Sequence, residues 1–328
     1  MDYSKLENID QLTRDDIVAM LKSDSAEEMH LLFEKAREVR SQNFGDVIKM
    51  RGNLKFTNYC EANCLYCQNR EDNFSLKRYR LSGDEIIETV KLYSNIGIDS
   101  VILQSGIDSY YDTDMISYII YSIRQNNDLS ITLSLGERGF DEYNTWKIAG
   151  AERYVLKHKT ANRNLYKIYH SKDRLTSRLN HLRLLKRLGY KIGTGIIIGL
   201  PYQTMEDIAD DILLCKELGV DVLTVSPFNP MPFTPYQNKE AGNRELVSKT
   251  IAVIRLIMQN VDIQTSSVIE SGNINVKEKC LNSGANIVVF NFEPNTDYDF
   301  HSSISKARED NNIPAYKKRL INIIKDLN

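Results

Sequence analysis

Hydrophobic and polar positions divide the chain into a helical start and a long alternating region. In residues 1–50, apolar positions recur at helical spacing, first over 15–21 and then over 26–39, as expected for amphipathic helices. From residue 53 onward, short β-rich runs alternate with helical stretches. That alternation is typical of parallel βαβ units.

Eight of these runs are expected to be strands. They cover residues 54–58, 100–106, 130–136, 153–159, 191–200, 220–228, 263–269 and 286–292. Eight strands separated by helices close a barrel. We therefore expect an α/β fold, a TIM-type (β/α)8 barrel over residues 51–295, with an N-terminal helical extension, 1–50, and a loop and C-terminal helix, 296–328.

The charge balance narrows the functions that we expect. Lys and Arg total 42 against 44 Asp and Glu, a net charge of -2, which gives no overall field for nucleic acid or an anionic membrane. No apolar run reaches the roughly 18 residues that span a bilayer, and the start lacks a basic and an apolar signal segment. We expect a cytoplasmic protein that acts on a small molecule or a protein.

Three of the five cysteines, Cys60, Cys64 and Cys67, lie close together after the first expected strand. That position is the C-terminal face of a barrel, where such folds build their active sites. Thiolates suit iron–sulfur clusters and zinc, and either group normally has four ligands. The next cysteine, Cys215, falls on an expected helix, so three local ligands leave one metal position open. A structural zinc site and three packed thiols remain the alternatives.

The Cys-x3-Cys-x2-Cys spacing after the first strand resembles the radical S-adenosylmethionine (SAM) superfamily. The resemblance implies one 4Fe-4S cluster whose open iron binds SAM, and reductive cleavage of SAM to a 5'-deoxyadenosyl radical. Tyr66, just before the third cysteine, matches the position that packs on the adenine; it could equally be an ordinary loop aromatic. Cys60, Cys64 and Cys67 are then both metal ligands and catalytic residues.

Successive blocks over residues 51 to 294 look like the HydE family of FeFe-hydrogenase maturases. The blocks LQSG, LSLGE and GLPYQT favour this family over biotin synthase and methylornithine synthase, which share the architecture. By this resemblance further residues contact SAM. They are Gln104, Ser105 and Gly106 near its methionine end, Lys157 at its carboxylate, Arg178 near the methionine moiety, and Gly199 and Leu200 beside the ribose and adenine.

Two positions depart from the maturase pattern, because Ile107 and Lys159 stand where that family has glutamates. Strand alternation puts Lys157 and Lys159 on the same side, facing the bound SAM. Two cations would then face a ligand that carries a sulfonium. We expect Lys159 to point away, to pair with a carboxylate such as Glu137, or to bind an anionic substrate.

Several further residues have simpler roles or line the expected substrate space. Cys215 and Cys280 are interpreted as buried small hydrophobic residues, and no cysteine follows Cys280 to hold a second cluster. Small hydroxyl side chains at inward strand positions would either bind the substrate or simply fit the barrel. These are Thr132, Ser134, Thr194, Thr224, Ser226 and residues 265–267.

The resemblance implies a radical SAM enzyme that acts in assembly of the FeFe-hydrogenase H-cluster. Its implied partners are a small-molecule or organometallic substrate, a ferredoxin or flavodoxin electron donor, and other hydrogenase maturation proteins, in an anaerobic host. Two alternatives remain. One is a mutase or synthase of the same branch that acts on an amino acid, and the other is a paralogue that binds SAM without cleaving it.

Overall fold

Eight parallel strands form a closed barrel in chain order, β1 to β8, in the computed structural model. The structure describes residues 3–45, 47–95, 98–126, 128–170, 174–264 and 279–292. The strands are β1 (Lys49–Lys55), β2 (Ser100–Gln104), β3 (Ser130–Ser134), β4 (Arg153–Val155), β5 (Lys191–Ile198), β6 (Val222–Pro227), β7 (Asp262–Gln264) and β8 (Ile287–Phe292). Pairing of β1 with β8 closes the barrel, which confirms the expected fold class.

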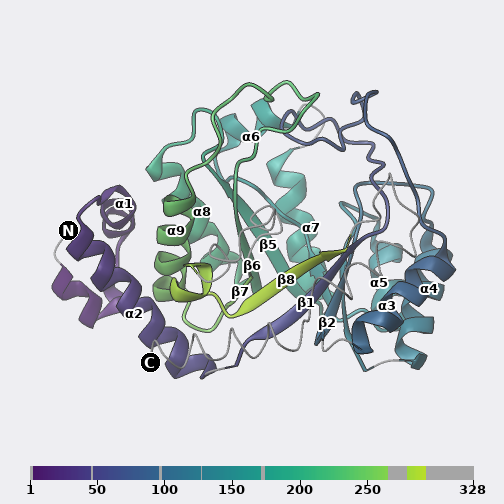
Figure 1. The fold of residues 1–328 in the computed structure, drawn as a ribbon, viewed down its shortest axis with the longest axis horizontal. Coiled ribbons are helices and arrows are strands. Elements are labelled where there is room, and N and C mark those ends of the chain that lie inside the picture. Colours follow the sequence, from purple (N-terminus) through teal and green to yellow (C-terminus); the bar gives the residue numbers. More distant parts are fainter. Residues whose placement is uncertain are drawn as a thin grey trace.

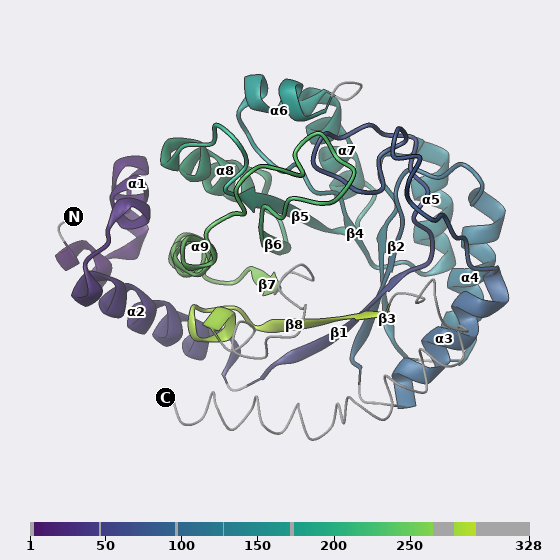
Figure 2. The same ribbon diagram turned by 45° about the horizontal axis from the view of Figure 1, so that its top comes forward.

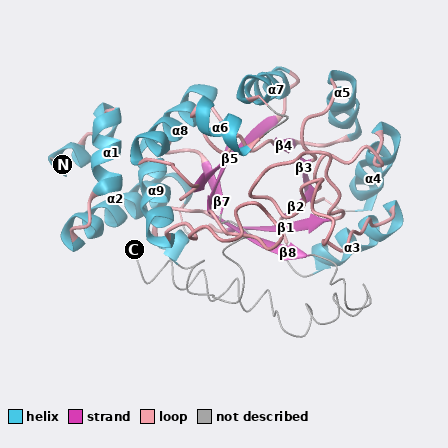
Figure 3. Ribbon diagram, turned by 90° about the horizontal axis from the view of Figure 1, so that it is seen from above, coloured by secondary structure: helices cyan, strands magenta, loops and turns pink. Residues whose placement is uncertain are grey.

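Helices surround the strands, as the view from above shows (Figure 3). They are α3 (Gly83–Asn95), α4 (Thr113–Asn126), α5 (Phe140–Ala149), α6 (Arg163–Tyr169), α7 (Leu175–Arg187), α8 (Met205–Leu218) and α9 (Arg244–Ile257). The α6 helix and the loop that follows β1 lie at the top of Figure 1, at the C-terminal mouth of the barrel. No helix in the described ranges is long and apolar enough to cross a membrane.

The N-terminal residues form two short 3-10 helices, η1 (Tyr3–Glu7) and η2 (Ile9–Gln11), and then α1 (Arg14–Lys22) and α2 (Ala26–Phe44). Helix α1 begins at Thr13, whose side chain accepts a hydrogen bond from the backbone N–H of Asp16 while the Asp16 carboxylate accepts one from Thr13. These helices lie beside α8 and α9 (Figure 2). Ion pairs from α1 to α8 join Arg14 to Asp210 and Lys22 to Glu206.

The two faces of the strands differ in polarity. Outward residues such as Leu133, Leu223 and Val288 belong to one large core shared with the helices. Inside the barrel, Arg51 of β1 donates to Gln264 of β7 (3.1 Å), so the two side chains meet across the interior. Further bonds of this kind join Asn53 to Asn291 and Gln264 to Thr224. Hydrogen-bonded polar side chains therefore line part of the interior.

Two of the expected strands differ most from the observed ones. The first strand is Lys49–Lys55 rather than 54–58, because its inward residues are polar and hide the apolar pattern. The fourth ends at Val155 rather than at residue 159, since Lys159 has a left-handed backbone (φ 73°) and makes only an isolated bridge to Ile196. The expectations for residues 265–278 and 293–328, including the C-terminal loop and helix, lie outside the described residues.

Thr194 was wrongly expected to face the barrel interior. A Cβ added to its neighbours Gly193 and Gly195 would meet Val155 and Lys157, so the side of β5 that faces these two residues is not the side of Thr194. The Thr194 hydroxyl instead donates to the backbone oxygen of Leu156 (3.0 Å) and lies 2.9 Å from Nδ1 of His158. Thr132, by contrast, is fully buried with no partner for its hydroxyl.

Candidate active site at the C-terminal mouth

Cys60, Cys64 and Cys67 lie on the loop that follows β1, and all three have intermediate exposure and form no disulfide. Backbone bonds attach this loop to two neighbouring segments. The N–H of Glu61 donates to the oxygen of Ile107 (2.8 Å), and that of Leu65 to the oxygen of Tyr169 (3.0 Å). The cysteine loop is therefore held at the barrel mouth against the loop that follows β2 and the end of α6.

The base of the cysteine loop is held by Asp108, a residue that sequence reasoning missed. Its buried carboxylate accepts two hydrogen bonds from Arg80 (2.9 and 3.0 Å) and one from Thr57 (2.9 Å). Burial alone would raise the pKa of Asp108, but these hydrogen bonds outweigh it and the pKa lies below its usual value. The Arg80 guanidinium also covers the ring of Tyr59 at 3.7 Å. Asp108 thus connects the loops after β1 and β2.

The guanidinium of Arg78 binds several backbone carbonyl groups on both sides of the three cysteines. It donates to the backbone oxygens of Asn69 (3.0 Å), Arg70 (2.7 Å) and Asn73 (3.3 Å), and also to that of Asn58. A guanidinium has five N–H donors in a fixed plane, so one side chain can bind several carbonyl groups at once. This contact shapes the segment that carries the three thiols.

Gly106 lies directly against Cys60. A Cβ placed on Gly106 would come within 2.5 Å of the Cys60 Cβ, 2.7 Å of the Tyr59 oxygen and 2.8 Å of the Cys60 Sγ. Only glycine allows this approach. Beside it, Gln104 ends β2, and Ser105 donates its hydroxyl to the backbone oxygen of Gly106 (2.7 Å). The Gln-Ser-Gly segment thus borders the cysteine loop at the mouth.

Tyr66 is oriented by His170, which sequence reasoning also missed. Nδ1 of His170 lies 3.0 Å from the Tyr166 carbonyl oxygen, which can only accept, so Nδ1 carries the proton. Nε2 is then the acceptor for the Tyr66 hydroxyl at 2.7 Å. Burial lowers the pKa of His170 to about 3, so the ring is neutral and this tautomer persists at neutral pH. Burial also raises the pKa of Tyr66.

Two lysines from the segment after β4 face the cysteine loop. The Nζ of Lys159 lies 5.9 Å from the centroid of the Tyr66 ring. Burial lowers the pKa of Lys159, and the nearby thiols of Cys67 and Cys64 act in the opposite direction. Burial, together with the charges of Lys159 and Lys55, lowers the pKa of Lys157 to about 7. The two lysines are thus on the same side, as expected.

Arg178, on α7, is paired with Glu137 at 2.9 Å. The Glu137 carboxylate also accepts a hydrogen bond from Ser177 (2.9 Å) and lies 3.4 Å from His181. Glu137 was considered as a partner of Lys159, but these three groups occupy it. Arg178 still acts on the site, since its charge lowers the pKa of His170 and of Lys159.

Gly199 and Leu200 form the turn after β5. Gly199 has φ 82°, a backbone conformation that favours glycine, and a Cβ there would meet the Cα of Gly242 at 2.5 Å. Leu200 is buried in a second, small apolar cluster against which Leu65 and Tyr66 pack. The turn after β5 therefore supports the cysteine loop through the packing of Leu65 and Tyr66 on the cluster that contains Leu200.

The chemistry of these donors fits a 4Fe-4S cluster better than a single metal ion. Within the described ranges, no group of three or more His, Cys, Asp or Glu side chains is close enough to hold one ion. In a cluster each thiolate binds a different iron, so the sulfurs stand farther apart than around one ion. Three thiols that form no disulfide, a glycine against Cys60 and nearby lysine charges suit an anionic cluster with one open iron.

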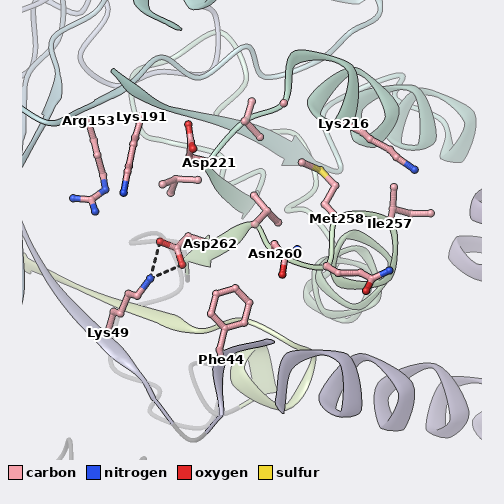
Figure 4. Close-up of a pocket in the computed structure, with 15 residues that line it drawn as sticks. Phe44, Lys49, Arg153, Lys191, Lys216, Asp221, Ile257, Met258, Asn260 and Asp262 are labelled. Carbon is pink, nitrogen blue, oxygen red and sulfur yellow. Dashed lines mark hydrogen bonds and ion pairs between the residues drawn. The ribbon is translucent and has the colours of Figure 1, made fainter. Parts of the chain in front are cut away.

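A cavity of about 540 Å³ lies at the opposite mouth of the barrel. Its lining includes the first residues of several strands, among them Lys49, Arg153, Lys191 and Asp262, and Lys49 pairs with Asp262 (Figure 4). Residues at the amino ends of barrel strands generally contribute to stability rather than to catalysis. The cavity is therefore separate from the cysteine site.

Comparison with known proteins agrees with this arrangement. Residues 54–215 match the model of the radical SAM superfamily. The chain is 40% identical to the [FeFe] hydrogenase maturase subunit HydE of Thermotoga maritima over 263 residues, 80% of this chain and 75% of that protein. It is 30% identical to 3-methylornithine synthase of Methanosarcina acetivorans, over 85% of this chain and 79% of that protein.

Solved structures give the same picture. Methylornithine synthase (PylB) superposes with a TM-score of 0.81 at 27% identity, covering 87% of this chain and 84% of that one. The maturase HydG superposes with a TM-score of 0.77 at 19% identity, over 91% of this chain and 68% of that one, and so supports the fold alone. The chain belongs to the radical SAM superfamily of enzymes and is related to the maturase HydE.

Proposed function

We propose that this enzyme cleaves SAM reductively and acts as a HydE-like maturase in assembly of the FeFe-hydrogenase H-cluster. The observation that carries the proposal is the cysteine triplet at the C-terminal mouth, held by Asp108, Arg78 and Gly106 in a chain 40% identical to HydE. A bound 4Fe-4S cluster would supply one electron to the SAM sulfonium, whose C–S bond breaks to give methionine and the 5'-deoxyadenosyl radical.

The chain's own residues would bind and orient the two cofactors. Cys60, Cys64 and Cys67 would hold the cluster and leave one iron open for SAM. Tyr66, fixed by His170, would present its ring to the adenine, and Lys157 would pair with the SAM carboxylate. The remaining predicted contacts are Gln104, Ser105 and Gly106 near the methionine end, Arg178 at the methionine moiety, and Gly199 and Leu200 at the ribose and adenine. In this proposal Lys159 faces the same space.

The polar interior would receive the second substrate below SAM. Thr132 is buried and its hydroxyl has no hydrogen-bond partner among the described residues. Gln264 of β7 donates a hydrogen bond to Thr224 of the neighbouring strand β6. A small-molecule or organometallic substrate could use these groups as hydrogen-bond partners. A ferredoxin or flavodoxin would supply the electron, and other maturation proteins would deliver or receive the iron centre.

A second candidate is an enzyme of the same branch that acts on an amino acid. The superposition on methylornithine synthase, with a TM-score of 0.81, favours it, as does the replacement of a glutamate by Lys159. A hydrogenase maturation assay separates the two functions. The cluster-loaded chain is added to a maturation mixture that lacks HydE, with the Cys64→Ala variant as control.

Cysteine-dependent activation of the hydrogenase supports the HydE role. No activation, together with SAM-dependent conversion of an amino acid by the same preparation, would transfer the assignment to the second candidate. The amino-acid products are identified by mass spectrometry, so each outcome has its own readout.

A further inference from the structure

Lys159 is held in an unusual position beside the cysteine loop. Its left-handed backbone (φ 73°) lies between two hydrogen bonds to β5, one from its N–H to Gly195 (2.8 Å) and one from Ile197 to its oxygen (3.1 Å). These bonds fix where the side chain begins. Its ammonium lies 5.9 Å from the centre of the Tyr66 ring, and Tyr66 stands between Cys64 and Cys67 in the loop. The charge is therefore directed at the cofactor site.

Lys157 and Lys55 bring further positive charge to the same space. Lys157 lies across Gly195, where a Cβ would meet its Cγ at 3.0 Å and its Cδ at 3.2 Å. Gly195 thus leaves room for the lysine stem. Lys55 is the last residue of β1, and its charge acts on Lys157 together with that of Lys159. Three lysines from two sides of the barrel therefore surround one space.

Two carboxylates of the cysteine site, among the residues that the structure describes, already have other partners. Glu137 binds Arg178, Ser177 and His181, and Asp108 binds Arg80 and Thr57. Among the described residues, neither Lys157 nor Lys159 makes an ion pair with a carboxylate. Since a buried ammonium is costly without an anion nearby, a negatively charged ligand in this space would stabilise the charged form of both lysines.

The two cofactors do not provide enough of it. A cluster on three thiolates carries a small net negative charge, whereas SAM carries a net positive charge because its sulfonium and ammonium outnumber its carboxylate. If Lys157 takes that carboxylate, as proposed above, the small negative charge of the cluster is left to face Lys159. We propose that Lys159, with Lys157 beside it, is a specificity-determining residue that selects an anionic second substrate and binds its negative group beside the cluster.

This inference rests on the proposed SAM site, and its test does not depend on SAM cleavage. Sulfate is the probe anion. It is titrated by calorimetry into the cluster-loaded protein with the cluster oxidised and SAM saturating, at constant ionic strength held with chloride. The oxidised cluster does not cleave SAM, and bound SAM occupies the open iron, so sulfate cannot bind there.

Four variants decide the outcome. We expect Lys159→Met and Lys159→Gln to weaken sulfate binding about tenfold or more, through the loss of one close charge-assisted contact, and Lys159→Arg to retain it. The matched control is Lys191→Met, a lysine at the opposite mouth. Visible absorption and SAM affinity of each variant verify that cluster and SAM are bound.

Three results would overturn the proposal. These are no sulfate binding to the parent protein, unchanged binding to both neutral variants of Lys159, or a loss in Lys191→Met instead, which would locate the anion in the cavity of Figure 4. A failure of SAM cleavage would leave all of these results unaffected. The two proposals can therefore fail separately.

Discussion

The contact between Gly106 and Cys60 gives the sharpest prediction about the cysteine loop. In Gly106→Ala, the added methyl group would lie 2.5 Å from the Cys60 Cβ, 2.7 Å from the Tyr59 oxygen and 2.8 Å from the Cys60 Sγ. Two of these atoms belong to a residue that must hold iron, and one is backbone. The Cys60 Cβ and the Tyr59 oxygen cannot move without the backbone, so the loop itself must move.

Overpacking of this kind typically costs about 1–3 kcal/mol. At about 1.4 kcal/mol for each factor of ten, cluster affinity should fall about fivefold to a hundredfold. The assay is anaerobic reconstitution at limiting iron and sulfide, followed by iron content per chain and visible absorbance. The free energy of unfolding without the cluster is measured in parallel, to separate a general loss of stability from a specific loss of cluster binding.

Gly83→Ala is the matched control. Gly83 begins α3, and its added Cβ would lie 3.6 Å from Cγ1 of Ile119, an ordinary van der Waals distance. We expect this variant to load its cluster like the parent. If Gly106→Ala also loads like the parent, the close packing of the segment after β2 against the cysteine loop is not what positions Cys60.

Three further predictions concern neighbouring residues. Lys159→Glu should make the reduction potential of the cluster more negative, because a carboxylate beside the thiolates disfavours the added electron. A redox titration monitored by EPR measures the potential, with Lys191→Met as the distant control. Equal potentials in the two variants would contradict the position of Lys159 beside the cluster. Tyr66→Phe loses its hydrogen bond to His170, about 1 kcal/mol, so SAM should bind about fivefold more weakly by equilibrium dialysis; unchanged affinity refutes the positioning role. Asp108→Asn should lower the free energy of unfolding by about 1.5–3 kcal/mol at pH 7. Because the pKa of Asp108 is lowered on folding, its stabilisation is complete above the ordinary aspartate pKa of about 3.9 and is lost as pH falls through the folded value. Chemical denaturation at several pH values should show that the difference in unfolding free energy between parent and Asp108→Asn shrinks in this acidic range. A difference that stays constant with pH refutes the prediction.

The local pattern of the sequence was enough to predict the barrel and the position of the cysteines. Outward strand residues such as Leu133 and Leu223 are apolar and pack on helices, so the alternation of strands and helices is visible in the chain. The first strand was misplaced because Arg51 and Asn53 face a polar interior. An apolar pattern cannot identify a strand whose inner face binds by hydrogen bonds.

The supporting contacts of the site could not be predicted in the same way. Tyr66 and His170 are 104 residues apart, and Thr57 and Asp108 are 51 apart. Neither separation matches the periodicity of a helix or a strand, so no local pattern in the sequence indicates the contact. Lys159 could be identified as unusual only by resemblance, and its left-handed backbone appears only in the structure. Such residues depend on loops brought together by the closed barrel.

Reductive cleavage of SAM is the central claim, and one anaerobic measurement tests it directly. The cluster is reconstituted in the parent protein and in Cys64→Ala, SAM and dithionite are added without a second substrate, and 5'-deoxyadenosine is quantified. We predict its formation by the parent and not by the variant, despite Lys159 and Ile107. No 5'-deoxyadenosine from a parent protein with a fully loaded cluster would contradict the account and indicate a site that binds SAM without cleaving it.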